Sequence, residues 1–139
     1  MIWKKNYSLK QMNQLSQQSA IEHLGIKFSA QGDDWLEATM PVDQRTVQPM
    51  GFLHGGLSVA LAETIGSMAG FCCINENQAV LGLDINANHL RPVKEGVVTA
   101  KATPVHLGKK IQVWQIHITD QQNKLCCIAR LTLSVVDHE

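Results

Sequence analysis

The pattern of hydrophobic and polar residues is dominated by one long apolar run. From Leu57 to Cys73 the residues are apolar, small or hydroxyl-bearing, and Glu63 is the one charged side chain among them. Most of these residues tolerate a helix well, and a helix that is hydrophobic on every side is buried. The run is nearly long enough to cross a bilayer, but a carboxylate near its middle is costly in lipid. We therefore predict a central helix that the rest of the chain wraps.

Shorter periodic segments precede and follow this helix. Ser8 is a good N-cap for a short amphipathic helix that continues or breaks near Ser19, and a further helical turn over 20–24 ends at Gly25. Alternation of apolar and polar residues predicts two strands before the central helix and four long ones after it. The strands are expected at 26–30, 35–40, from 80 onward, 97–107, 111–119 and 125–136.

Two features refine these strands. Pro41 ends the second strand, and Pro104 indicates a bulge or a sheet edge in the fourth. In the third strand the odd positions over 81–87 are apolar and His89 follows them, which predicts a face that leaves the core and reaches a site. Four long consecutive strands after one buried helix predict an α+β fold, in which a curled antiparallel sheet surrounds a long central helix. At 139 residues we expect a single domain, 1–139.

A glycine-rich loop leads into the central helix and carries candidate chemistry. Pro49 biases Gln48 towards an extended backbone, so the glutamine side chain can project from the loop. Gly55 and Gly56 lie where the first N–H groups of a helix have no intrahelical partner. Those N–H groups and the positive end of the helix dipole suit an oxyanion that forms from a thioester carbonyl. A plain tight turn remains the alternative for the glycine pair.

Glu63 is the second candidate. Its neighbours one helical turn away offer no cation, so an unpaired carboxylate on an apolar helix is a candidate base or nucleophile. The alternative is a carboxylate that simply reaches solvent. Gly55 and Glu63 are eight residues apart, which is roughly 12 Å along a helix axis at 1.5 Å per residue. Both could act on one carbonyl if two copies of the chain contribute to one site.

The run Gln48-Pro49-Met50-Gly51-Phe52-Leu53-His54-Gly55-Gly56, with Glu63 eight residues after Gly55, resembles the hotdog-fold acyl-CoA thioesterases. The resemblance is to the branch that contains 4-hydroxybenzoyl-CoA and 1,4-dihydroxy-2-naphthoyl-CoA hydrolases, and it extends over nearly the whole chain, through segments 36–43, 83–89, 112–116 and 125–127. It implies the hotdog fold, hydrolysis of an aromatic or short acyl-CoA, no cofactor, a homodimer that forms the site and a homotetramer.

The resemblance also implies roles for individual residues. The Gly55 N–H would polarise the thioester carbonyl, Gln48 would donate a second hydrogen bond to it or orient it, and His54 would lie near the sulfur. Glu63 of the second copy would attack as a nucleophile or activate water, and Ser67 would hold that water or the carboxylate. Expected substrate-binding residues are Met68, Gly82, His89, Leu90, Arg91, Pro92, His106, Leu107, Gly108, Lys109, Lys110 and Ile111.

Composition narrows the remaining choices. The net charge is zero, which gives no support for a nucleic-acid partner, but five cations and one anion fall between Arg91 and Lys110, where coenzyme A phosphates could bind. The cysteines form two adjacent pairs, Cys72-Cys73 and Cys126-Cys127, without metal or redox spacing, and we expect them to be buried and reduced. No metal site is expected. Without a visible signal peptide or membrane span, a cytoplasmic protein is expected.

Two other functions stay open at this stage. A hotdog dehydratase acting on 3-hydroxyacyl thioesters also uses a histidine and an acid near a central helix. A non-catalytic module that only binds acyl-CoA would keep the same fold. Release of free thiol distinguishes hydrolysis from both alternatives.

Overall fold

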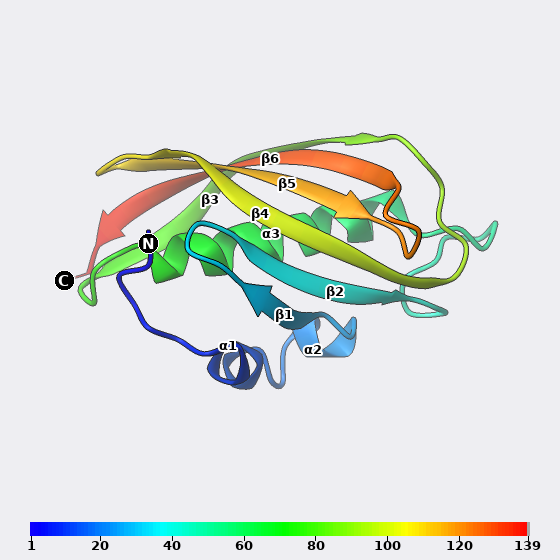
Figure 1. Cartoon of the computed structure of the whole chain (residues 1–139), viewed down its shortest axis with the longest axis horizontal. Helices are drawn as coiled ribbons and strands as arrows, with labels where there is room; N and C mark the ends of the chain where they lie inside the picture. Colours follow the sequence, from blue (N-terminus) through cyan, green and yellow to red (C-terminus); the bar gives the residue numbers. More distant parts are fainter. Residues whose placement is uncertain (139) are drawn as a thin grey trace.

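A single antiparallel sheet curls around one long helix in the computed structural model, which describes residues 1–138 (Figure 1). The predicted α+β hotdog architecture is thereby confirmed. In chain order the elements are α1 (Leu9–Leu15), α2 (Ala20–His23), β1 (Lys27–Gln31), β2 (Leu36–Val42), α3 (Gly55–Cys72), β3 (Gln78–His89), β4 (Gly96–Leu107), β5 (Ile111–Thr119) and β6 (Leu125–Asp137). The two short helices, α1 and α2, lie beside the hairpin of strands β1 and β2, at the bottom of the view in Figure 1.

The six strands follow the order β1-β2-β4-β5-β6-β3, so β1 and β3 form the two edges. All neighbouring strands are antiparallel. The predicted bulge in β4 is present, because the register with β5 shifts between Pro104 and His106. The prediction that Pro41 ends its strand is wrong: Pro41 lies inside β2 opposite Val97.

The core lies between α3 and the concave face of the sheet. Trp114, Ile116 and Ile118, at alternate positions of β5, are fully buried there. Gly66 and Gly70 let α3 approach the sheet closely, because a Cβ at either glycine would lie within 2.6 Å of a leucine methyl of β6. One face of α3 is therefore buried and the opposite face is not, contrary to the prediction of a helix enclosed on all sides.

The N-terminal segment closes the C-terminal end of α3. The Lys5 ammonium group is buried and donates hydrogen bonds to the carbonyls of Phe71, Ile74 and Asn75, at 3.0, 3.0 and 3.3 Å. A cation at this end complements the helix dipole and satisfies carbonyls that lack intrahelical partners. Trp3 stacks on Trp114, with ring centroids 6.4 Å apart, and covers the core at the same end.

In strand β3, the side chains that face the core are not the ones predicted. Leu81 and Leu83 were expected to face the core, but they are 56% and 59% exposed. The reason is a bulge: Gly82 pairs with Leu133 and Asp84 with Thr132, which leaves Leu83 without a partner. The bulge shifts the alternation by one residue, so Gly82 and, beyond it, Ile85 share the inner face with the buried leucines of β6.

The cysteines behave as the sequence predicts. All four are buried and free. Burial raises the pKa of the Cys72 thiol from 9.0 to about 11 and that of Cys73 to about 12, so both stay protonated near neutral pH. Within residues 1–138, no helix is long and apolar enough to cross a bilayer.

Candidate active site

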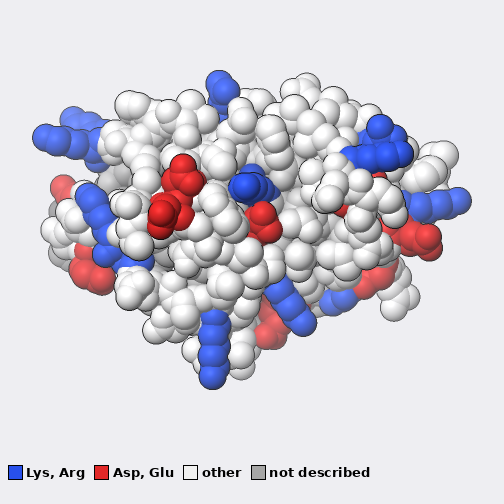
Figure 2. Space-filling model, viewed as in Figure 1, with Lys and Arg blue, Asp and Glu red and all other residues white. Residues whose placement is uncertain are grey.

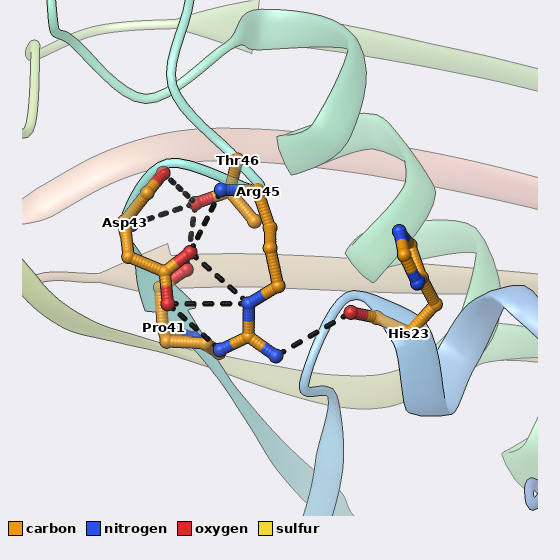
Figure 3. Close-up of polar contacts among 5 residues, drawn as sticks. All are labelled: His23, Pro41, Asp43, Arg45 and Thr46. Carbon is orange, nitrogen blue, oxygen red and sulfur yellow. Dashed lines mark hydrogen bonds and ion pairs between the residues drawn. The ribbon is translucent and has the colours of Figure 1, made fainter.

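The loop between β2 and α3 is fixed by a compact set of polar contacts (Figure 3). The Thr46 hydroxyl is buried and donates to the Pro41 carbonyl at 2.8 Å. The Arg45 guanidinium binds the Asp43 carboxylate at 2.7 Å, and this contact holds the pKa of Asp43 below its usual value. Arg45 also donates to the His23 carbonyl at 3.4 Å. These contacts set the direction from which the chain enters the helix.

Gln48 begins a tight turn at the middle of this loop. The Gly51 N–H donates to the Gln48 carbonyl at 2.8 Å, and Gly51 has φ +88°, a conformation that suits glycine. The Gln48 side-chain oxygen accepts a hydrogen bond from the Met50 N–H. Since the amide oxygen is occupied, the NH2 end of Gln48 is the group left to donate to a ligand.

His54 is the N-cap of α3. Its Nδ1 accepts a hydrogen bond from the Gly56 N–H at 2.9 Å, which places the ring proton on Nε2. The Gly55 N–H finds no acceptor within the part of the chain that the structure describes, as expected for the first residue of a helix. This end of α3 therefore offers a free backbone donor and an imidazole with an Nε2–H.

A cavity of about 390 Å³ opens beside the Gly55 backbone. His89, at the end of β3, packs its imidazole where a Gly55 side chain would lie, since a Cβ there would be 3.1 Å from His89 Nε2. Among the lining residues that carry a hydroxyl or a thiol, Ser58 and Cys126 were not predicted from the sequence. Ser58 lies one turn after Gly55, a spacing that could have indicated it, whereas Cys126 arrives from β6 without a local signal. The lining is Gln48, Phe52, Leu53, Gly55, Ser58, His89, Leu90, Arg91, Pro92, Val93 and Cys126.

Glu63 lies elsewhere, on the outward face of α3. It is exposed, and the one ion pair within residues 1–138 joins Arg45 to Asp43, so no cation pairs with Glu63. Within one chain this carboxylate is exposed and is not desolvated. Glu63, Ser67 and Met68 line a mainly apolar groove of about 490 Å³ between α3 and the two short helices.

The turn between β4 and β5 contributes to a third cavity, of about 900 Å³, near the C-terminal end of α3. Lys4, Lys109 and Lys110 line it with Asp137, which leaves an excess of positive charge. Figure 2 shows basic side chains at the end of the molecule where this turn lies in Figure 1, and otherwise charges of both signs are scattered over that face. His106 is exposed beside the turn.

The predicted site residues thus fall into three groups within one chain. Gln48, Gly55 and residues 89–92 meet at the start of α3, Glu63, Ser67 and Met68 share the groove at its middle, and residues 107–111 line the far cavity. Gly82 lies near the second group, since a Cβ added there would be 3.0 Å from Glu63 Oε2. No group of three or more potential metal ligands occurs among the described residues.

Comparisons with known proteins identify the type of enzyme. The model of the thioesterase superfamily matches residues 50–127, which hold the three glycines of the loop, all of α3, strands β3 to β5 and the start of β6. The 1,4-dihydroxy-2-naphthoyl-CoA hydrolase of Escherichia coli is 52% identical over 136 residues, 98% of this chain and 100% of that protein. The proofreading thioesterase EntH of Cronobacter turicensis is 50% identical over 98% of this chain and 99% of that protein.

Solved structures agree with these matches. The crystal structure of a thioesterase from Haemophilus influenzae has a TM-score of 0.97 to this chain at 65% identity, and the match covers 99% of this chain and 96% of that one. The chain therefore belongs to the hotdog-fold thioesterase superfamily and is a thioester hydrolase.

Proposed function

We propose that this enzyme hydrolyses aromatic or short acyl-CoA thioesters in a site that two copies of the chain build together. The observation that carries the proposal is the free Gly55 N–H at the start of α3, beside the Gln48 amide and a cavity. Two hydrogen-bond donors and the positive helix end can stabilise the oxyanion that forms when a thioester carbonyl is attacked. The Nε2–H of His54 would face the sulfur or the departing thiol.

Glu63 supplies the attacking group in this proposal. Its carboxylate either adds to the carbonyl carbon or removes a proton from a water that adds, and Ser67, one turn further on, holds the carboxylate or the water. Roughly 12 Å of helix separates Glu63 from Gly55 within one chain, at 1.5 Å per residue. The Glu63 of a second copy would meet the first copy's Gly55 once the two chains associate.

The unpaired edge of the sheet supports that association. Strand β3 is a twelve-residue edge strand, and it exposes Leu81 and Leu83. A long edge with apolar side chains is ordinarily covered, because it otherwise pairs with other chains. A second β3 related by a two-fold axis would cover it and enclose the exposed Glu63. We propose a homodimer as the active unit and a homotetramer of two such dimers.

The remaining predicted residues fit the two ends of an acyl-CoA. Met68 lies beside Glu63 in an apolar groove and would contact the acyl group. Residues 89–92 line the cavity beside Gly55 and would hold the thioester and the nearby part of the coenzyme. Lys109 and Lys110 carry charge suited to its phosphates. The names of the relatives favour aryl groups such as 1,4-dihydroxy-2-naphthoyl as the acyl part.

The test is thiol release from a panel of aryl, short-chain and long-chain acyl-CoAs, measured for the wild type and for Glu63→Gln. The variant should fold normally and lose at least about a hundredfold in kcat, because removal of a catalytic group costs several kcal/mol of transition-state stabilisation. Glu76→Gln is the matched control, since Glu76 lies in the exposed loop after α3, and it should keep full activity.

Other results would contradict the proposal. Near-native turnover by Glu63→Gln would remove the carboxylate from the mechanism. Water loss from 3-hydroxyacyl thioesters without thiol release would identify a dehydratase. Tight coenzyme A binding without turnover of any substrate would identify a binding module.

A further inference from the structure

Gly82 of strand β3 lies beside the proposed catalytic carboxylate of Glu63. A Cβ built on Gly82 would lie 3.0 Å from Glu63 Oε2, closer than side chains normally approach. Gly82 faces the inner side of the sheet opposite the buried Leu133. Val80 and Ile85, the flanking residues on that side, pack partly buried against the core. The carboxylate of Glu63 therefore lies against the strand at the one inner position that carries no side chain.

The bulge after Gly82 has an electrostatic consequence at the same place. Without it, strict alternation would put Asp84 on the inner face, two residues from Gly82 and beside Glu63. The extra residue Leu83 shifts the register, so Asp84 pairs with Thr132 on the outer face. Two carboxylates within a few ångströms repel each other and cannot both stay ionised at low cost. The bulge thus keeps a like charge away from Glu63, and bulges commonly redirect side chains near active sites.

We propose that Gly82 is a positioning residue: its missing side chain and the bulge that follows it hold the Glu63 carboxylate in its working position. This role differs from direct contact with substrate, the role that family resemblance suggests for Gly82. The inference rests on the proposed function, since it requires Glu63 to be the catalytic acid.

Gly82→Ala tests the inference. The added methyl group forces the carboxylate to move by a few tenths of an ångström, which a flexible side chain can do without unfolding the sheet. Because small displacements of reacting groups are costly, kcat should fall about tenfold while KM stays near the wild-type value. The loss should be similar for aryl and short acyl-CoAs, and Gly82→Val should lose more. Circular dichroism, melting temperature and elution volume should stay unchanged.

The double variant Glu63→Gln/Gly82→Ala separates positioning from other effects. If Gly82 acts through Glu63, adding Gly82→Ala to Glu63→Gln should change the residual rate by less than about twofold. Asn86→Ala, on the outer face of the same strand, is the matched control and should keep its kcat. Wild-type kcat in Gly82→Ala, a KM increase that depends on acyl size, or an equal loss in Asn86→Ala would overturn the inference. Near-native activity of Glu63→Gln alone would overturn the proposed function instead.

Discussion

At the residue scale, His54 combines a structural and a proposed chemical role in one imidazole. Its Nδ1 caps α3 by accepting the Gly56 N–H, and this hydrogen bond fixes the proton on Nε2. An imidazolium could not accept that bond, so the cap requires the neutral ring. The two nitrogens therefore have separate tasks, and substitutions can separate them.

His54→Ala and His54→Asn are expected to differ in stability but not in activity. Alanine removes the cap and should lower the free energy of unfolding by about 1 kcal/mol. Asparagine is a good N-cap, so it should keep the free energy of unfolding within a few tenths of a kcal/mol of the wild-type value. Both remove the Nε2–H and should lower kcat. Urea unfolding and thiol release measure the two effects. Full activity in His54→Asn would mean that His54 serves only as a cap.

At the element scale, α3 lies close to the sheet because two glycines face it. A Cβ on Gly70 would lie 2.5 Å from both Gln112 Oε1 and Leu133 Cδ1, and one on Gly66 would lie 2.6 Å from Leu131 Cδ2. Gln112 is buried and also donates to the Gly70 carbonyl at 3.3 Å, so its side chain has little freedom to move. The helix accepts the intrinsic cost of glycine in exchange for close packing.

Gly70→Ala should destabilise the protein more than Gly66→Ala. The crowded site at Gly70 should cost about 1–3 kcal/mol from overpacking, which exceeds the gain of ~1 kcal/mol from helix propensity. At Gly66 only one leucine methyl group must shift, so the overpacking cost of Gly66→Ala should nearly cancel its gain in helix propensity. Ala60→Gly, on the outward face, measures the propensity term alone. Urea midpoints compare the three variants, and a Gly70→Ala protein more stable than wild type would contradict the packing argument.

At the scale of the whole molecule, the described chain contains the parts of a site but holds them apart. The free Gly55 N–H lies at one end of α3, Glu63 faces outward at its middle, and the lysines of the β4–β5 turn lie near the other end. The edge strand β3 runs beside the outward carboxylate through Gly82. Pairing of two β3 edges would bring one copy's carboxylate towards the other copy's glycine loop.

Mixing two inactive variants tests this arrangement. Glu63→Gln and Gln48→Ala should each lose activity, but dimers formed from one chain of each contain one site in which both residues are intact. After joint unfolding and refolding in equal amounts, about a quarter of all sites should be wild type, as two-fold symmetry requires. Thiol release before and after refolding measures the recovery. If each site lay within one chain, the mixture would stay inactive.

The sequence by itself determined the elements and the glycine-rich loop at the start of the central helix. The helix, the strands and the Gly-Gly loop follow from local periodicity and from backbone preferences, which act over a few residues. The lack of a cation near Glu63 could also be read from helical spacing. Boundaries differed by a few residues, and Pro41 continued its strand because β2 is held by pairing with β4.

Only the tertiary structure decided which side chains of β3 face inwards. The bulge in β3 turned Leu81 and Leu83 outward and placed Gly82 against Glu63, and no local pattern announces such a shift, because it depends on pairing with β6, some fifty residues later in the chain. Lys5 at the end of α3 and Cys126 beside Gly55 likewise come from distant segments. Short-range preferences thus specified the helices and strands, and contacts between segments far apart in the sequence decided which residues pack together.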